Sequence, residues 1–395
     1  MAKAKKKPAK KAAPRKAASK KKVAAKKSVR KVTAKVKATA KKAASPKKNK
    51  IVQQKGLMAR LDDEGVICAE GYVFELERRG YLQAGAFVPE VLMEHPEVVE
   101  RLHRDFVHAG SDVVQALTYY VHREKLRVIG REKDLEPMNK IALKLAKKVA
   151  RDTGTLFAGD ICNTNIYDAG DKKAIKEVER IFEEQVGWAS DAGVDYIVAE
   201  TFSWGGEALM ALQAIKKYSK VPAVVTFSLH REDSVREGWD GVETCKRLED
   251  AGADVVGLNC HRGPQTMMPM LKKIRNAVKC HVAALPVPYR TTPQEPSFMS
   301  LTDTCCPGVR PFPVGLDPFT CTRNEIFDFG REAFSIGIRY LGVCCGAGPH
   351  HIRGLAEGMG RHPEASKYSV DMSRHAFFGE HKRIKDVQKE YRTRL

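Results

Sequence analysis

Short, continuous apolar runs recur along the chain from residue 65 onward. They are rich in β-branched residues and do not alternate with polar ones, which is typical of strands buried on both faces of a parallel sheet. Eight such runs are predicted strands: residues 65–71, 112–120, 155–162, 194–202, 221–229, 253–260, 280–288 and 338–345. The pattern therefore predicts a chain whose core is a parallel sheet.

Helical patterns separate these runs. Residues 89–110 and 172–193 place apolar side chains at intervals of three or four positions, as one buried face of a helix requires. A small residue and a glycine then lead directly into the next strand, at 109–114 (AGSDVV), 192–198 (AGVDYIV), 251–257 (AGADVVG) and 336–343 (IGIRYLGV). Glycine suits the left-handed end of a helix, so the repeated unit is a helix followed at once by a strand.

Eight strands that alternate with helices are the number found in a (β/α)8 (TIM) barrel of the α/β class. We assign residues 51–360 to this barrel and residues 361–395 to a short C-terminal helical extension, which ends in a basic, helix-prone segment at 380–395. A doubly wound open sheet is the alternative that the pattern leaves open. In a barrel, the chemistry is expected at the carboxyl ends of the strands.

Residues 1–50 differ sharply from the rest of the chain in charge. They contain 22 Lys or Arg and no Asp or Glu, whereas residues 51–395 contain 47 basic and 48 acidic residues. This tail is rich in lysine and alanine and has too few large apolar residues to fold, so we predict that it is disordered. Its composition resembles that of linker-histone tails, and its charge favours non-specific contact with DNA or RNA. An anionic membrane surface, or no partner, are the alternatives.

The sequence shows no targeting signal and no membrane-spanning segment. No apolar run follows the basic tail as it would in a secretory signal, and no stretch of 18 apolar residues occurs. We therefore expect a cytoplasmic protein, or one that its tail associates with a nucleoid or nucleus. The ten cysteines are then expected to be thiols or metal ligands rather than disulfides.

Three cysteines are predicted to meet at the carboxyl end of the barrel. Cys260 ends the sixth strand, Cys344 and Cys345 end the eighth, and both strands lie on the same side of a closed barrel. Adjacent cysteines have Cα atoms about 3.8 Å apart, too close for an unstrained disulfide. Three thiolates with no fourth protein ligand favour a zinc site with one open position. Ordinary core cysteines, or an iron–sulfur cluster completed by Cys162, are the alternatives.

The charge of such a centre indicates its chemistry. A zinc ion with three thiolates is net negative, which makes it a poor site for producing hydroxide, so a metal-dependent hydrolase or lyase is disfavoured. The centre suits a substrate thiol, which becomes a nucleophilic thiolate at neutral pH. We therefore predict the transfer of an alkyl group to a thiol.

Two segments resemble the zinc-binding motifs of the homocysteine S-methyltransferase family, and most of all those of its betaine–homocysteine enzymes. These segments are GLNCHRGP at 257–264 and GVCCGAGPHHIR at 342–353. The similarity runs from about Gly56 to about Gly358 and includes GYVFELERRGYLQAG (71–85), LTYYVHREKL (117–126) and REAFSIGIRYLG (331–342). The resemblance implies a (β/α)8 barrel that binds Zn²⁺ through Cys260, Cys344 and Cys345 and forms methionine from homocysteine.

The resemblance also implies roles for residues that bind homocysteine. Glu200 matches the family glutamate that binds the amino group, and Asn259 lies in the first zinc motif, so both are assigned to the substrate site. Glu70 is assigned there too, although it lies one position away from the family's aspartate, a shift that would turn it to the other face of a regular strand. Glu200 and Tyr120 are assigned as catalytic.

The methyl donor implied by the resemblance is an onium compound, either betaine or a sulfonium. Aromatic faces bind such a group, because a trimethylammonium group makes no hydrogen bonds. Phe87, Tyr119 and Tyr120 match aromatic positions of the family's donor site. Thr201 replaces a further family tyrosine, and Trp204 is a candidate substitute for it.

Other interpretations stay open. A barrel of the same kind could methylate another small thiol or a selenol, or the protein could be a nucleic-acid binder whose barrel is a non-catalytic scaffold.

The betaine enzymes carry a long C-terminal arm that builds oligomers, whereas residues 361–395 are few, which predicts a monomer or a small homo-oligomer. His350 and His351 open the last predicted helix and are expected to point outward. Cys305 and Cys306 are expected to be ordinary loop thiols.

Overall fold

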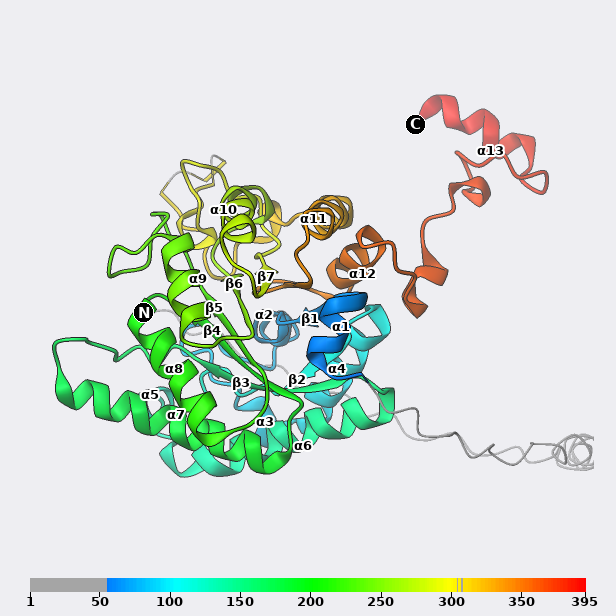
Figure 1. Cartoon of the computed structure of the whole chain (residues 1–395). Coiled ribbons are helices and arrows are strands. Elements are labelled where there is room, and N and C mark those ends of the chain that lie inside the picture. Colours follow the sequence, from blue (N-terminus) through cyan, green and yellow to red (C-terminus); the bar gives the residue numbers. More distant parts are fainter. Residues whose placement is uncertain (1–54, 304, 307) are drawn as a thin grey trace, which may run out of the picture. The chain divides into compact units, whose positions relative to one another are not determined.

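The computed structural model describes residues 55–303, 305–306 and 308–395. The tail at 1–50, with its predicted disorder and nucleic-acid contact, lies outside the described residues. Within them, eight strands form a closed barrel that helices surround (Figure 1). The (β/α)8 barrel predicted from the sequence is confirmed.

Each strand lies inside the residue range predicted for it. The strands are β1 (Val66–Ala69), β2 (Val113–Gln115), β3 (Leu156–Cys162), β4 (Tyr196–Phe202), β5 (Ala223–Phe227), β6 (Val255–Asn259), β7 (His281–Leu285) and β8 (Tyr340–Val343). All neighbouring pairs are parallel, and β1 pairs with β8 with Val66 opposite Tyr340. This last pair closes the sheet, so the doubly wound open sheet is wrong.

Helices connect the strands and cover the outside of the barrel. The α-helices are α1 (Leu57–Asp63), α2 (Tyr72–Arg78), α3 (Val91–Glu94), α4 (Pro96–Ala109), α5 (Arg123–Val128), α6 (Leu135–Thr153), α7 (Lys172–Ala192), α8 (Gly205–Tyr218), α9 (Gly241–Asp250), α10 (Pro264–Ala277), α11 (Arg323–Ser335), α12 (Pro349–Gly358) and α13 (Asp386–Tyr391). Gly110 and Gly193 end α4 and α7 with φ angles of 116° and 74°. The small-residue–glycine phrases are therefore helix ends, as predicted.

The interior of the barrel is packed below the strand ends. Tyr196 from β4 and Tyr340 from β8 reach each other there, with hydroxyl oxygens 3.0 Å apart. A Cβ atom added at Gly342 would lie 2.1 Å from the carbonyl oxygen of Cys68, so only glycine lets β8 approach β1 this closely. Because side chains fill the interior, the barrel is a packed core, and its ligand sites are expected at the carboxyl ends of the strands.

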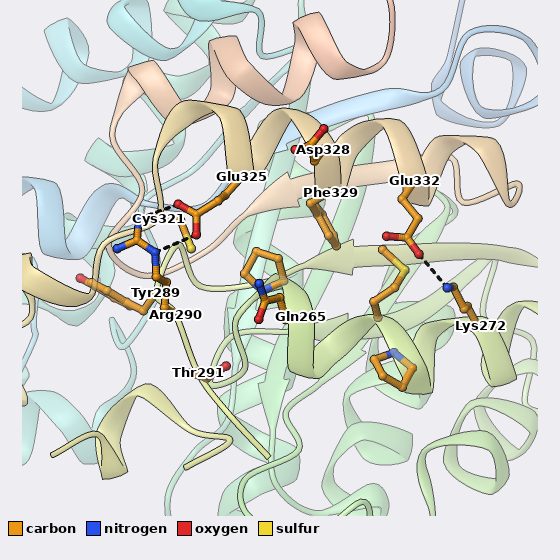
Figure 2. A pocket seen from close by; sticks show the side chains of 13 residues that line it. Gln265, Lys272, Tyr289, Arg290, Thr291, Cys321, Glu325, Asp328, Phe329 and Glu332 are labelled. Carbon is orange, nitrogen blue, oxygen red and sulfur yellow. Dashed lines mark hydrogen bonds and ion pairs between the residues drawn. The ribbon is translucent and has the colours of Figure 1, made fainter. Parts of the chain in front are cut away.

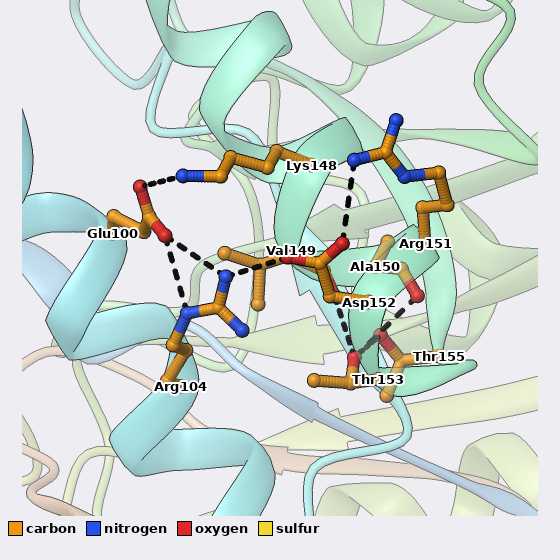
Figure 3. A network of polar contacts seen from close by, with 9 residues as sticks. All are labelled: Glu100, Arg104, Lys148, Val149, Ala150, Arg151, Asp152, Thr153 and Thr155. Atoms are coloured by element: carbon orange, nitrogen blue, oxygen red, sulfur yellow. Dashed lines mark hydrogen bonds and ion pairs between the residues drawn. The ribbon is translucent and has the colours of Figure 1, made fainter. Parts of the chain in front are cut away.

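A polar network joins α4 to α6 on the outside of the barrel (Figure 3). Arg104 on α4 donates to Glu100, one turn earlier, at 2.9 Å and to Asp152 of α6 at 2.7 Å. Lys148 of α6 donates to Glu100 at 2.8 Å. Single surface ion pairs contribute little to stability, but a shared network fixes the relative positions of two helices that pack on neighbouring strands.

The C-terminal extension begins with an anchored residue. Arg361 pairs with the carboxylate of Asp112 and donates to the carbonyl oxygen of Gly65 at 2.7 Å, which ties the end of the barrel domain back to β1 and β2. Beyond it the structure contains only short helical turns and α13, whose residues are not buried. None of the helices in the described part of the chain combines the length and hydrophobicity needed to cross a bilayer.

Two glycines of the barrel are expected to respond oppositely to alanine. Gly187 lies inside α7 with nothing within 4 Å of an added Cβ, so Gly187→Ala should stabilise the protein by about 0.5–1 kcal/mol through the lower entropy of the unfolded chain. Urea unfolding measured by circular dichroism tests this.

Gly342→Ala is the matched contrast, because the same methyl group would overlap the backbone of β1. We expect a loss of about 3 kcal/mol or more, the upper range for overpacking. Equal midpoints for the two variants would contradict the close approach of β1 and β8.

Candidate metal centre and substrate pocket

Three cysteine sulfurs converge at the carboxyl end of the barrel. Cys260 directly follows β6, and Cys344 and Cys345 directly follow β8, with only β7 between the two strands. Their Sγ atoms all lie within 4.8 Å of one another. Sulfurs that share a tetrahedral zinc ion at about 2.3 Å are about 3.8 Å apart, so the spacing fits a zinc site without a change in the fold. Cys345 is partly exposed, which leaves one side of the cluster open.

The electrostatics of the three thiols fit a cation. Hydrogen bonds from Cys344 and Cys345 lower the pKa of Cys260 well below its ordinary value. Burial raises the pKa of Cys344 well above it. One sulfur can therefore ionise with the help of the other two thiols, but three buried thiolates side by side require a positive ion between them.

Cys162 stands apart from this cluster. It ends β3, and its Sγ accepts a hydrogen bond from the backbone N–H of Tyr120 at 3.2 Å. Burial raises the pKa of its thiol well above the ordinary value, as for a protonated core cysteine. An iron–sulfur cluster needed this residue as a fourth ligand, so the described structure gives that alternative no support.

Two glutamates lie against the sulfur cluster. Carboxylate oxygens of Glu70 and Glu200 lie within 4.8 Å of each other and of the Cys344 Sγ atom. Glu200 accepts hydrogen bonds from Gln115 at 2.8 Å, Asn259 at 2.7 Å and Thr201 at 2.9 Å. Burial raises the pKa of Glu200 to about 7. Asn259 thus places the carboxylate of Glu200 beside the predicted metal ligands.

The side chain of Glu70 faces the pocket with Glu200 and does not point to the opposite face, as the alternation of a regular strand would predict. The strand β1 ends at Ala69, one residue before Glu70, so the alternation of side chains no longer applies. The side chain is 7% exposed, and one carboxylate oxygen lies 3.4 Å from the amide nitrogen of Asn259. Its other oxygen has no hydrogen-bond partner.

Sequence reasoning missed two residues of this pocket. Gln115 on β2 accepts a hydrogen bond from Cys68 and donates to Glu200, which links the packed interior to the pocket. Asp160 on β3 lines the pocket with Glu70, Glu200 and the cysteine pair. The signal that could have identified Asp160 is that it is the one charged residue in the otherwise apolar run LFAGDIC. An acid is rarely buried without a partner or a role.

The aromatic residues assigned to the donor lie in two groups. Tyr119 and Tyr120 contact each other with ring centroids 4.3 Å apart, and Tyr119 also lines the pocket with Glu200. The ammonium of Lys125 lies over the Tyr120 ring, 3.8 Å from its centroid. Phe87 instead stacks on Phe74 at 5.4 Å, in an aromatic cluster that continues through Phe298.

Thr201 and Trp204 have other contacts. The hydroxyl of Thr201 donates to Glu200, so this residue supports the carboxylate and offers no aromatic face. The guanidinium of Arg236 lies 4.4 Å from the centre of the Trp204 ring, and Tyr167 packs against that ring at 5.8 Å. Both neighbours would have to move before Trp204 could contact a donor.

Left-handed backbone conformations gather around this site. Among the described non-glycine residues with positive φ are Phe87 (55°), Tyr120 (61°), Thr201 (63°), Cys260 (59°) and His261 (56°). Such conformations cost of order 1–3 kcal/mol each and persist where the surrounding structure fixes them, commonly at functional sites. Thr201 and Cys260 directly follow Glu200 and Asn259, so two of these conformations occur where β4 and β6 bring residues to the site.

The two histidines near the cysteine pair differ in position. His350 is exposed. His351 is 1% exposed, and the prediction that it points outward is wrong. Its Nδ1 accepts a hydrogen bond from the backbone N–H of Gly348, and its Nε2 lies 3.0 Å from the carbonyl oxygen of Cys321. It therefore caps the start of α12. Cys305 and Cys306 are exposed.

A larger groove of about 440 Å³ lies between α10 and α11, on the outside of the barrel (Figure 2). Arg290 pairs with Glu325, and Lys272 on α10 pairs with Glu332 on α11, both at 2.6 Å. None of the residues that the sequence assigned to the site lines it. The residues that the sequence assigned to the site include Glu70, Tyr119, Glu200, Cys344 and Cys345, which line the smaller pocket at the strand ends instead.

Comparisons with known proteins agree with this geometry. The family model described as homocysteine S-methyltransferase matches residues 66–359. Betaine–homocysteine S-methyltransferase 1 of Bos taurus is 34% identical over 337 residues, which cover 82% of this chain and 79% of the relative. An S-methylmethionine–homocysteine S-methyltransferase of Mus musculus is 33% identical over 333 residues, with 82% and 86% coverage.

Solved structures support the fold. The metallated form of the homocysteine methyltransferase MmuM from Escherichia coli superposes with a TM-score of 0.60 at 19% identity, covering 76% of this chain and 98% of that chain. At this identity the likeness concerns the barrel alone. The family model and the curated relatives together confirm the resemblance read from the motifs at 257–264 and 342–353. The chain belongs to the homocysteine S-methyltransferase family.

Proposed function

We propose that this chain transfers a methyl group from an onium donor, betaine or a sulfonium, to the thiol of homocysteine, with Zn²⁺ held by Cys260, Cys344 and Cys345. The observation that carries the proposal is the convergence of these three sulfurs beside two buried carboxyl groups. The relatives named above supply the substrate class, since both act on homocysteine and differ in the donor. When bound, zinc would supply the charge that keeps the substrate sulfur a thiolate at neutral pH.

The carboxylate of Glu200 is proposed to hold the amino group of homocysteine. Gln115, Asn259 and Thr201 fix that carboxylate in one orientation beside Cys344. An ammonium group bound there leaves the substrate thiol directed at the cysteine cluster. Holding the thiol at a fixed distance from a second substrate can supply several kcal/mol of rate enhancement, on the order of 7 or more in favourable cases.

The chemical step is a direct displacement. The substrate sulfur forms a bond to the methyl carbon while the bond from that carbon to the donor's nitrogen or sulfur breaks. The electron pair of the broken bond stays on the donor atom, which becomes neutral. The donor needs no proton, so no general acid is required on its side. Tyr119 and Tyr120 offer the electron-rich faces that stabilise the cationic donor before transfer.

Full-length protein mixed with homocysteine and, separately, betaine, S-methylmethionine and dimethylsulfoniopropionate tests the function. Methionine formed with at least one donor is the expected result. A panel of other small thiols and selenols belongs in the same assay, because faster methylation of one of them would replace homocysteine as the substrate. No methylated thiol from any donor would reject the proposal.

Removal of one predicted ligand should remove the metal and the activity together. In Cys260→Ala we expect zinc content to fall from about one per chain to near zero, and methionine formation to fall by more than the roughly 10- to 100-fold that loss of an outer hydrogen-bond partner costs. Elemental analysis and a turnover assay measure the two effects. Cys245→Ala is the control, because Cys245 is equally buried in α9 but outside the cluster. Retained zinc in the first variant would show that the metal, if any, lies elsewhere.

Replacement of the proposed ammonium-binding carboxylate should act on substrate binding. In Glu200→Gln one oxygen becomes an amide that faces the donors Gln115 or Asn259, and the charge is lost. We expect KM for homocysteine to rise by about 10- to 100-fold, as for loss of a hydrogen bond to a charged group, with zinc content unchanged. Glu207→Gln is the control, since Glu207 is a buried acid in the first turn of α8 that accepts from Thr164 and does not line the pocket. An equal rise in both variants would assign the effect to general loosening of the barrel.

A further inference from the structure

One buried carboxyl group at the site lacks a well-placed hydrogen-bond donor. Asp160 lies in the middle of β3, is 3% exposed, and lines the pocket that Glu200 and the cysteine pair also line. Neither of its oxygens has a hydrogen-bond partner of good distance and angle, although the amide of Gln115 and the backbone of Tyr119 lie near enough to lower its pKa and Glu200 lies near enough to raise it. A buried carboxylate left in this way is costly, so its position indicates that a ligand completes it.

The surroundings of Asp160 lack positive charge. The pocket lining includes the acids Glu70 and Glu200, and among its described residues there is no Lys, Arg or His. Burial raises the pKa of Asp160 well above its ordinary value, repulsion from Glu200 adds to the rise, and the amide of Gln115 and the backbone of Tyr119 only partly offset it. The group that would complement Asp160 is therefore a cation that donates hydrogen bonds.

The remaining acceptor capacity favours a primary ammonium group. A carboxylate has about four acceptor positions, and Glu200 already accepts three hydrogen bonds from the protein. An ammonium group has three N–H donors, so Glu200 can satisfy about one of them, whereas both oxygens of Asp160 and one of Glu70 lack a partner in good hydrogen-bond geometry.

The free space points to the same group. The volume of the pocket is about 20 Å³. A site of this size takes one water-sized group, which an ammonium is. A trimethylammonium or dimethylsulfonium group is larger and has no N–H to donate, so the methyl donor is a poor occupant.

We propose that Asp160 binds the amino group of homocysteine together with Glu200, as a second carboxylate contributed by β3. This inference rests on the proposed function, because it concerns the same substrate. It assigns recognition of the ammonium to two neighbouring strands, β3 and β4, whose carboxyl ends both open on the pocket. The chain should therefore select strongly for thiols that carry a primary amine.

The wild-type protein tests selection without any substitution. The zinc-loaded full-length chain is titrated calorimetrically with L-homocysteine and with 4-mercaptobutanoate, which is the same thiol acid without the amino group. We expect homocysteine to bind at least about 100-fold more tightly, as for two lost hydrogen bonds to charged groups. Equal affinities would overturn the inference even if methyl transfer is observed.

Asp160→Asn assigns the selection to this residue. The substitution keeps the shape of the side chain and removes its charge. We expect homocysteine affinity to fall by about 10- to 100-fold, while affinity for 4-mercaptobutanoate stays within about twofold of wild type. Glu207→Gln is the control for loss of a buried acid, and it should weaken neither thiol selectively.

The possible results separate the two proposals. If Asp160 only supports the barrel, or is neutralised by a metal cation instead of a substrate ammonium, Asp160→Asn changes both affinities equally or neither, and the inference fails while methyl transfer persists. If the wild-type chain binds no thiol and methylates none, the proposed function fails and the inference fails with it. If Asp160→Asn does not fold, the comparison of the two thiols in the wild-type chain still decides, because equal affinities overturn the inference.

Discussion

The carboxyl end of this barrel concentrates acidic groups in a place where water is scarce. Three thiols and three carboxyl groups face the same buried region, and the described residues that line the pocket between them include no basic side chain. In a low dielectric these groups cannot all be ionised unless cations enter. Metal binding, substrate binding and the protonation of the site are therefore different aspects of one charge balance. Without a bound cation the negative charge of the site is not neutralised. The raised pKa values of Glu200 and Asp160, and the difference between the pKa values of Cys260 and Cys344, reflect this.

The fold creates this concentration by geometry. Parallel strands end at the same rim, so single residues from β1, β3, β4, β6 and β8 meet although they are far apart in the chain. Packed tyrosines close the interior below them, and the backbone takes left-handed conformations at Cys260 and Thr201, beside the site. The stability of the barrel thus maintains a backbone conformation and a charge arrangement that would be unfavourable in isolation.

The region assigned to the donor already holds positive charge from the chain itself. The ammonium of Lys125 lies over Tyr120, and the guanidinium of Arg236 lies over Trp204. Both contacts demonstrate that these aromatic faces accept a cation. The proposed onium donor would have to compete with Lys125 for the face of Tyr120. Phe87 instead stacks on Phe74 within a separate aromatic cluster.

The order of strands and helices followed from the sequence alone, because apolar runs and glycine-terminated helices are local patterns. The positions of Cys260, Cys344 and Cys345 at strand ends followed as well, since the rim of a parallel barrel collects such residues whatever their spacing in the chain. Which way a side chain points after its strand ends is a different matter. The inward carboxylate of Glu70, the burial of His351 and the place of Asp160 and Gln115 in the pocket depend on contacts between segments up to 189 residues apart. Only the tertiary structure decides them, because packing and long-range hydrogen bonds override the local alternation from which a sequence is read.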